Sequence, residues 1–285
     1  MLKHNYPFEA FGTNWVIETN DELDSSLKQT IQNRIEAFDA VYSRFRADSL
    51  VTEISQKAGE YLFPSDAMKL FEFYRSLYEL TDGKVTPLIG DMISRAGYDA
   101  NYSLQAQAQQ SVKTWNEVLS WDGLSLTTTE PVLLDFGAAG KGYMVDIIAA
   151  ILDEHSISDY VIDASGDLRH KGTSDNVVGL EHPLESGKVI GVVAVMNRSL
   201  CASASNRRAW GEGMHHIFDP GEMAPTQNII ATWVIANEAM IADGLATALF
   251  FVGAERLSDD YDFEYVRMCA DGSVQYSPYF EGKLF

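Results

Sequence analysis

The sequence has few cysteines, a shortage of basic side chains and no long apolar stretch, and each shortage excludes a class of protein. Its two cysteines, Cys201 and Cys269, are far apart and have neither a CxxC nor a metal-binding spacing, so we expect two buried free thiols, with one disulfide between them as the alternative. The 21 basic and 41 acidic residues give 21 − 41 = −20, which argues against a general binder of nucleic acids or anionic membranes. The longest uncharged run, residues 223–237, is 15 residues long and partly polar, whereas a membrane span needs about 20 apolar residues.

The composition is otherwise that of an ordinary globular protein, with 46% hydrophobic and 22% charged residues. Residues 1–7 carry no apolar signal core and no lipobox cysteine, so the sequence predicts a cytoplasmic protein. The length of 285 residues allows one large domain or two small ones. Because no linker rich in glycine, serine or proline divides the chain, we expect a single domain over residues 1–285, in which two lobes could form.

Hydrophobic periodicity predicts an α+β fold with a mixed, mostly antiparallel sheet flanked by helices. Apolar residues three and four apart predict a helix over residues 27–45, and Pro64-Ser65-Asp66 starts a second that Thr81-Asp82-Gly83 ends. A loop-rich stretch is expected over residues 90–116. Two further helices are expected at 142–155 and 237–252, and strands at 8–18, 132–134, 160–162, 177–180, 190–196, 216–218, 229–235 and 264–268.

A run of small residues, from Asp135 to Tyr143 (DFGAAGKGY), joins an apolar strand to a helix. Such a turn lets a ligand approach the backbone closely, and the helix start favours an anion. The run is not a Walker phosphate loop, since Asp135 stands at its first glycine and Gly142, rather than Ser or Thr, follows Lys141. The GxGxxG dinucleotide fingerprint is also absent, so an ordinary tight strand-to-helix connection remains the alternative.

A second candidate is the pair Asp243 and Thr247, which are four residues apart and therefore share one face of a strongly apolar helix. A carboxylate and a hydroxyl oxygen suit a hard cation such as Mg²⁺. The alternative is an exposed polar stripe with a helix-capping aspartate.

Three shorter segments complete the candidates. His216 stands three residues before Asp219-Pro220, which suits an acid/base residue or a strand-end histidine bonded to backbone. Residues 163–167 form a turn around Gly166 that a ligand could approach, or a simple tight turn. The run 203–208 ends in Arg207-Arg208, which suits a phosphate contact or a solvated surface pair.

Taken together and in order, these segments resemble the ApbE family, the FAD:protein FMN transferases, over residues 8–253. Phe11-Gly12-Thr13 is similar to the family's Met-Gly-Thr, and Ser43 to Ser49 is similar to its Ser-x-Tyr-Arg-x-x-Ser. Residues 82–88 stand where the family has Gly-x-Phe-Asp. Residues 135–146 resemble its Asp-Leu-Gly-Gly-Ile-Ala-Lys-Gly-Tyr-x-x-Asp, 163–167 its Gly-Gly-Asp turn, 216–220 its His-x-Ile-Asp-Pro and 242–247 its Ala-Asp-x-x-x-Thr helix.

The resemblance implies an enzyme that binds FAD in a cleft, uses Mg²⁺ on its pyrophosphate, and moves FMN onto a Thr or Ser hydroxyl of a target flavoprotein with release of AMP. It implies that the side chains of Asp243 and Thr247 and the carbonyl of Gly140 hold Mg²⁺, with His216 as the base. Phe45 stands at a position usually Tyr and is expected to stack on a ring of FAD. The full set of expected FAD contacts is Phe11, Phe45, Lys84, Val85, Thr86, Lys141, Tyr143, Gly166, Asp167 and Phe218.

Several positions depart from the family pattern, and they leave two other functions open. Val85-Thr86 replaces Phe-Asp, Glu222-Met223 replaces Thr-Gly, Ala202-Ser203-Ala204 replaces Thr-Ser-Gly, and Ser165 replaces a glycine. Lost glycines restrict the approach of a ligand to the backbone. The alternatives are a hydrolase that splits FAD into FMN and AMP, and a non-catalytic flavin-binding or assembly protein.

Overall fold

The computed structural model describes residues 2–174, 176–211 and 213–285. The chain forms two compact units. The first comprises Met1–Ile35, Lys141–Arg207 and Gln227–Phe285, and the second comprises Glu36–Gly140 and Arg208–Thr226. The prediction of one domain over residues 1–285 stays a prediction.

The first unit is built on an eight-stranded sheet in which every pair of neighbouring strands is antiparallel. This arrangement confirms the predicted α+β class with a mostly antiparallel sheet. The strands in spatial order are β1 (His4–Ala10), β2 (Thr13–Thr19), β6 (Tyr160–Asp163), β7 (Asp167–Lys171), β10 (Ser199–Ala204), β15 (Ile229–Ala236), β16 (Glu264–Cys269) and β17 (Val274–Tyr276).

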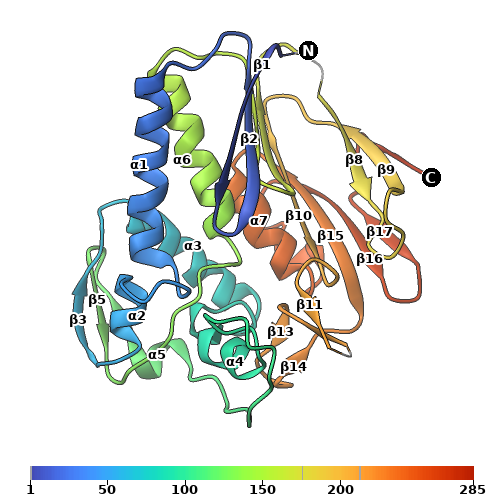
Figure 1. Cartoon of the computed structure of the whole chain (residues 1–285). Coiled ribbons are helices and arrows are strands. Elements are labelled where there is room, and N and C mark those ends of the chain that lie inside the picture. The colour runs from blue at the N-terminus through green and yellow to red at the C-terminus, as the bar shows by residue number, and fades with distance from the viewer. Residues whose placement is uncertain (1, 175, 212) are drawn as a thin grey trace. The chain divides into compact units, whose positions relative to one another are not determined.

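Both faces of the central strands are covered, which explains why β15 is apolar along most of its length. Helix α7 (Ala239–Ala248) packs against β10 and β15 (Figure 1). A second sheet, with the order β18 (Lys283–Leu284), β9 (Val189–Ala194) and β8 (Val177–Glu181), contributes to a core shared with the large sheet. That core joins Leu180 and Val193 of the small sheet to Trp233 and Val266 of the large one.

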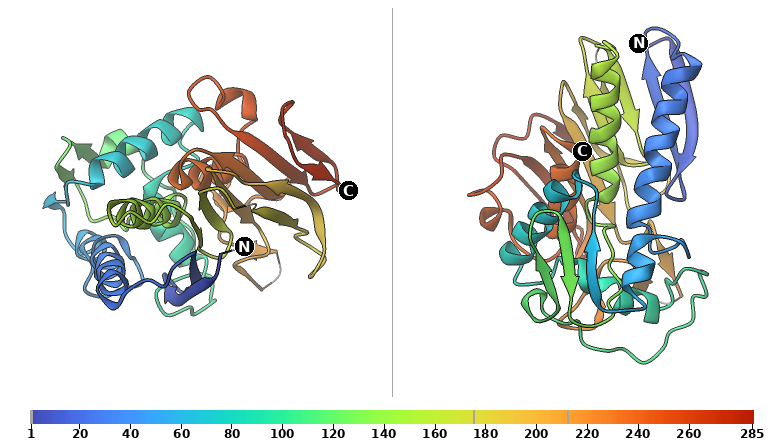
Figure 2. Two further views of the ribbon diagram at one scale, coloured as in Figure 1. Left: turned by 90° about the horizontal axis from the view of Figure 1, so that it is seen from above. Right: turned by 90° about the vertical axis from the view of Figure 1, so that its left-hand side faces the viewer.

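Two long helices and one short one complete the first unit. Helix α1 (Ser25–Tyr42) begins here and continues into the second unit, and its first half runs beside the second half of α6 (Gly140–Glu154) in Figures 1 and 2. A 3₁₀ turn, η2 (Ala254–Arg256), follows α7.

The second unit is mostly helical. Its α3 (Ala67–Leu80) confirms the predicted bounds, and the predicted stop forms as expected. The Gly83 N–H bonds to the Tyr78 carbonyl (2.7 Å), with Gly83 at φ +80°, the left-handed ending that glycine favours. The other elements are α2 (Leu50–Ile54), η1 (Pro87–Ile89), α4 (Gly90–Arg95), α5 (Trp115–Val118), a sheet of β3 (Gly59–Leu62), β5 (Ser125–Thr128) and β4 (Leu119–Trp121), and the pairs β11 (Ala209–Trp210)/β12 (Met214–His215) and β13 (Phe218–Asp219)/β14 (Ala224–Pro225).

Four predicted elements need correction. The single strand over 8–18 is a hairpin, because Phe11 (φ 52°) and Gly12 (φ 70°) both adopt the left-handed conformation of a two-residue turn. The stretch 90–116 contains α4 and the start of α5. Residues 132–134 form no strand, and the Val132 N–H donates to the Ile54 carbonyl at 3.4 Å. The predicted strand at 216–218 does not form, because β12 ends at His215 and β13 begins at Phe218, so His216 lies in neither.

The structure can be compared with two predictions, one on the cysteines and one on membrane-spanning segments. Both cysteines are free, as expected, but only Cys201 is buried, whereas Cys269 is partly exposed. In the part of the chain that the structure describes, no helix has the length and the apolar character needed to cross a membrane.

Candidate functional site

In the first unit, the buried carboxylate of Asp167 pairs with the ammonium of Lys141. Asp167 begins β7 and is only 1% exposed, and its Oδ2 lies 3.1 Å from Lys141 Nζ. Lys141, at the start of α6, also donates to the Ala164 carbonyl at 2.9 Å. Burial lowers the pKa of Lys141, but the charges of Asp167 and Asp243 outweigh burial and hold the pKa above its usual value. The ammonium is therefore charged and fixed.

Asp243 lies in the same charged network, on α7. Its side chain is 5% exposed, and its Oδ2 accepts the Gly142 N–H at 2.9 Å. The two helices meet so closely that a Cβ on Gly142 would lie 2.3 Å from the Ala239 carbonyl oxygen and 2.7 Å from Asp243 Cβ. Glycine at this position is thus a requirement of the contact between α6 and α7.

The donor set around Asp243 fits a hard divalent cation. Thr247 follows one helical turn later and is partly exposed, so a carboxylate and a hydroxyl oxygen lie on one face. Among the described residues there is no group of three or more His, Cys, Asp or Glu side chains that could hold a metal. Any ion held here therefore depends on neutral oxygens and on oxygens of a ligand, as Mg²⁺ often does.

Gly140, the third predicted metal ligand, opens helix α6. A Cβ there would lie 3.7 Å from Phe136 Cβ, which is an ordinary contact. The described surroundings of Gly140 in the second unit therefore leave room for a side chain at this position.

Asp146 has a role that sequence reasoning missed. Its two carboxylate oxygens accept the N–H groups of Ala239 (2.9 Å) and Met240 (2.8 Å), the first residues of α7, and Oδ1 also pairs with Arg169 at 2.7 Å. One α6 side chain thus caps the helix that carries Asp243 and Thr247. The position four residues after Gly142, on the same face of α6, was the available signal.

The turn between β6 and β7 lies beside the turn between β1 and β2. Ser165 adopts φ 56°, in place of the family's glycine, and donates to the Asn14 carbonyl at 2.6 Å. Gly166 follows at φ 111°, and the Phe11 ring packs edge-on against Trp15 at 5.9 Å. The predicted residues Phe11 and Gly166 therefore belong to neighbouring turns, whereas the side chain of Tyr143 is buried.

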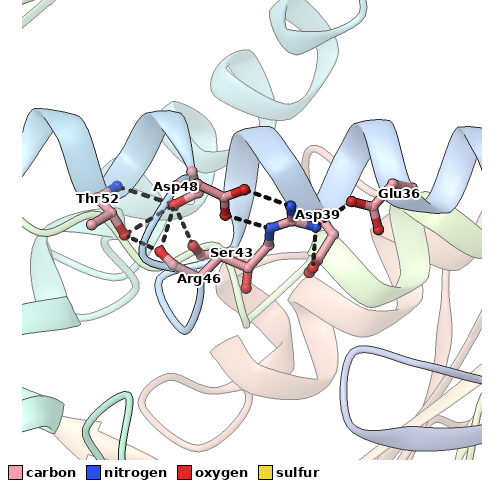
Figure 3. Close-up of polar contacts among 7 residues, drawn as sticks. Glu36, Asp39, Ser43, Arg46, Asp48 and Thr52 are labelled. Atoms are coloured by element: carbon pink, nitrogen blue, oxygen red, sulfur yellow. Dashed lines mark hydrogen bonds and ion pairs between the residues drawn. The ribbon is translucent and has the colours of Figure 1, made fainter.

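In the second unit, a network around Arg46 fixes the turn that carries Phe45 (Figure 3). The Arg46 guanidinium bonds to Asp48 (2.9 Å), Glu36 (2.6 Å) and Asp39 (3.3 Å). Ser49 caps α2 and donates to the Ser43 carbonyl at 2.6 Å. Phe45 thus lies just after α1, on a turn held at both ends, and not within the helix predicted for residues 27–45.

Phe45 belongs to a cluster of aromatic rings that the sequence did not indicate. The Tyr102 ring stacks on Phe45 at 5.5 Å with an interplanar angle of 9°, and Tyr98 meets both rings edge-on. Tyr98 in turn stacks on Trp210 at 5.7 Å, and the Trp210 indole donates to the Ala96 carbonyl at 3.1 Å. We call these four residues, Phe45, Tyr98, Tyr102 and Trp210, the aromatic cluster.

Two arginines contact the aromatic cluster. Arg44 lies 4.2 Å from the Phe45 centroid and pairs with Asp135 at 2.5 Å, while Arg208 lies 5.8 Å from the Tyr98 centroid. Burial raises the pKa of Asp135, but Arg44, the Gly137 N–H and Arg208 more than offset this and hold the pKa below its usual value. The sequence indicated Arg208 only as part of the pair Arg207-Arg208. The structure separates the two roles, because Arg207 pairs with Glu181 at the surface, whereas Arg208 contacts Tyr98.

His216 lies beside Arg208. Burial, then the positive charges of Arg208 and His215, lower the pKa of His216 to about 3, and the charge of Asp135 opposes them. Its Nδ1 is buried and has no hydrogen-bond partner among the residues that the structure describes. His216 is therefore neutral near pH 7, with one ring nitrogen unused.

The neighbouring His215 is occupied by the backbone. Its Nε2 lies 2.8 Å from the Thr226 carbonyl, and its Nδ1 accepts the Ile217 N–H at 3.3 Å. Because Nδ1 accepts, the assigned tautomer carries its proton on Nε2. Of the two histidines, only His216 has a ring nitrogen left for chemistry.

The remaining predicted contacts are mostly buried. Lys84 pairs with Asp219 at 2.7 Å, but the side chains of Val85, Thr86 and Phe218 are buried. Thr86 accepts the Leu88 N–H and so starts η1. Among these four predicted residues, Lys84 is the one with an accessible side chain, and the others offer a ligand chiefly their backbone.

The structure therefore gathers the predicted residues in two groups. In the first unit, one charged network joins Lys141, Asp167 and Asp243. In the second unit, Arg208 lies over the Tyr98 ring, which contacts Phe45, and the charge of Arg208 lowers the pKa of His216. Asp146, Arg44, Tyr98, Tyr102 and Trp210 complete these groups and were not predicted.

Comparison with known proteins gives one consistent result. The model of the ApbE family matches residues 11–262. The chain is 26% identical over 253 residues to the FAD:protein FMN transferase of Vibrio cholerae, covering 82% of this chain and 75% of that protein. It is 21% identical over 276 residues to the FAD:protein FMN transferase of Escherichia coli K12, covering 88% and 79% of the two chains.

Solved structures agree on the fold. The flavin transferase ApbE from Vibrio cholerae superposes with a TM-score of 0.80 at 20% identity over 96% of both chains. The ApbE protein from Thermotoga maritima gives a TM-score of 0.83 at 20% identity, over 96% of this chain and 97% of that one. With a family model matching most of its length and motifs in the same order, the chain belongs to the ApbE family.

Proposed function

We propose that this protein is an FAD:protein FMN transferase that moves FMN from FAD to a Thr or Ser hydroxyl of a cytoplasmic flavoprotein and releases AMP. The observation that carries the proposal is the buried network of Lys141, Asp167 and Asp243 at the contact of α6 and α7. A protein with a net charge of −20 needs local positive charge to hold a pyrophosphate. The family relatives named above are FAD:protein FMN transferases.

Each residue of the first unit has a role in this proposal. Lys141, charged and fixed by Asp167, binds a pyrophosphate oxygen. Asp243 and Thr247, with the Gly140 carbonyl, would hold Mg²⁺, which when bound neutralises charge on the pyrophosphate. Asp146 holds the start of α7 in place, so that Asp243 and Thr247 keep their positions. Phosphoryl transfer depends mainly on such positioning and charge neutralisation.

His216 is the proposed base of the transfer step. The hydroxyl oxygen of the acceptor forms a bond to the FMN phosphorus, the bond from that phosphorus to the bridging oxygen breaks, and AMP leaves with the bridging oxygen. The hydroxyl proton passes to His216, whose unused nitrogen is neutral at pH 7. An anionic dinucleotide near Arg208 would offset one of the charges that lower the His216 pKa, and so strengthen the base.

The test is to mix the purified protein with FAD, Mg²⁺ and a candidate acceptor flavoprotein, and to resolve AMP, FMN and protein-bound flavin. The proposal expects AMP and protein-bound flavin in equal amounts. Asp243→Asn should abolish the reaction, whereas Asp271→Asn, at an exposed carboxylate bonded only locally to Ser273, should react normally. AMP with free FMN and no protein-bound flavin would instead show a hydrolase, and FAD binding without AMP would show a flavin-binding protein.

A further inference from the structure

Tyr102 is the most exposed member of the aromatic cluster. The side chain of Tyr102 is 53% exposed, whereas Tyr98 and Trp210 are 8% and 7% exposed. Phe45, the ring expected to stack on FAD, is only partly accessible and already contacts Tyr102 and Arg44. A planar ligand that reaches the cluster from solvent therefore meets Tyr102 first.

The backbone holds Tyr102 in place at a cost in strain. Tyr102 adopts φ 50° and Leu104 adopts φ 55°, a left-handed conformation that is unfavourable for residues other than glycine. Both carboxylate oxygens of Asp99 fix this turn, one accepting the N–H groups of Asn101 (2.9 Å) and Ser103 (3.0 Å) and the other the Ser103 hydroxyl (2.5 Å). The turn is thus built to present the Tyr102 ring to Phe45.

The charge beside the cluster suits an anionic ligand. Arg44 is paired with Asp135, but Arg208, over Tyr98, has no ion-pair partner in the described part of the chain. An exposed aromatic face next to an unpaired guanidinium matches a planar heteroaromatic ring that carries a phosphate. Both halves of a flavin dinucleotide have this chemistry, one with the flavin ring and the other with the adenine ring.

We propose that Tyr102 is a ring-binding residue, against which one planar ring of the dinucleotide stacks, with Phe45 supporting Tyr102 from behind. This inference rests on the proposed function, since it takes the dinucleotide of that function as the ligand. Stacking of a base on an aromatic side chain contributes about 1–3 kcal/mol. The alternative is that Tyr102 only shields Phe45 from water, a task that any large apolar side chain performs.

The experiment measures equilibrium binding of FAD, FMN and AMP to the full chain, to three Tyr102 variants and to one control variant. Tyr102→Ala should weaken FAD binding by about 5- to 150-fold, Tyr102→Leu by nearly as much, and Tyr102→Phe by less than about 2-fold. Tyr279→Ala, at a more exposed tyrosine of the first unit, is the matched control and should bind like the parent chain. The ring that stacks on Tyr102 is identified by whether FMN or AMP loses affinity in the Tyr102→Ala variant.

The outcomes separate this inference from the proposed function. Equal FAD affinity in the parent chain and in Tyr102→Ala, or full affinity in Tyr102→Leu, would overturn the inference. A parent chain that binds FAD in this Tyr102-dependent way but releases no AMP would overturn the proposed function alone. A parent chain that binds none of the three ligands would overturn both. Unchanged thermal unfolding of Tyr102→Ala, expected for a half-exposed side chain, shows that a loss of affinity is not a loss of fold.

Discussion

Gly142 gives the sharpest test of how the first unit holds its charged network. A Cβ added at Gly142 would lie 2.3 Å from the Ala239 carbonyl oxygen, a backbone atom that cannot rotate away. The Gly142→Ala variant must therefore move α6 away from α7. Gly140, two residues earlier in the same helix, provides the matched control, because a Cβ there makes only ordinary contacts at 3.7 Å and beyond.

The expected magnitude follows from three effects. Overpacking of this kind costs about 1–3 kcal/mol, and weakening the buried hydrogen bond from the Gly142 N–H to the Asp243 carboxylate costs about 1.5–3 kcal/mol. Replacing glycine by alanine within a helix returns up to about 1 kcal/mol. We expect Gly142→Ala to lower the free energy of unfolding by about 1.5–5 kcal/mol, and Gly140→Ala to leave it unchanged or raise it slightly.

The assay is equilibrium unfolding in denaturant, with FAD cleavage measured in parallel. Gly142→Ala should also impair cleavage, because the displaced helices carry Lys141 and Asp243. Gly140→Ala should keep its activity, since its proposed ligand atom is a backbone carbonyl. If Gly142→Ala is as stable and as active as the parent chain, then α6 and α7 do not meet as described, and the assignment of Asp243 loses its structural basis.

Three further predictions concern single side chains. Burial holds the pKa of His216 near 3, against an ordinary value of 6.5, so the stabilising contribution of the neutral ring should be complete above about pH 6.5 and should fall as the pH drops toward 3. By pH 5 the expected loss is about 2 kcal/mol (1.5 units at 1.36 kcal/mol each). The free energy of unfolding should therefore decrease with falling pH in the parent chain, and this decrease should be missing in His216→Phe. A His216 ring that titrates near pH 6.5 by NMR would contradict this. Asp146→Ala should lower the free energy of unfolding by about 2 kcal/mol or more, because two N–H groups at the start of α7 and the Arg169 guanidinium lose their partner. A loss below about 0.5 kcal/mol in a denaturant titration would show that Asp146 does not cap α7. Asp243→Asn should keep the fold, since the amide oxygen can still accept the Gly142 N–H, but it should lose Mg²⁺-dependent release of AMP. Thr247→Ala should lose this activity in part. If both variants release AMP at the parental rate, Asp243 and Thr247 are not metal ligands.

The family and the class of fold were accessible from the sequence because their signals are local. Helix α3 has an apolar face, a Pro64-Ser65-Asp66 start and a Thr81-Asp82-Gly83 end, all within one continuous segment, and its bounds were predicted correctly. The order of short motifs indicated the ApbE family for the same reason. Each motif is a few adjacent residues whose conformation, such as the left-handed ending at Gly83, depends on local backbone geometry.

Local signals failed where two conformations fit the same residues. The hairpin at Phe11 and Gly12 was predicted as one strand, because phenylalanine rarely adopts a positive φ and therefore does not mark a turn. The segment 132–134 is apolar enough for a strand, but the fold supplies no neighbouring strand for it. Whether an extended apolar segment becomes part of a sheet depends on a partner that lies elsewhere in the chain.

The chemistry of the candidate site was decided by the tertiary structure. The spacing of Asp243 and Thr247 indicated a shared helical face, but only the packing of α6 against α7 gave Asp243 its partner, the Gly142 N–H, from a residue about 100 positions away. Likewise, Arg207 and Arg208 are adjacent in sequence, yet one pairs with a surface glutamate and the other contacts Tyr98. Periodicity determines which face of an element is apolar, whereas burial, pairing and pKa depend on which other element packs against that face.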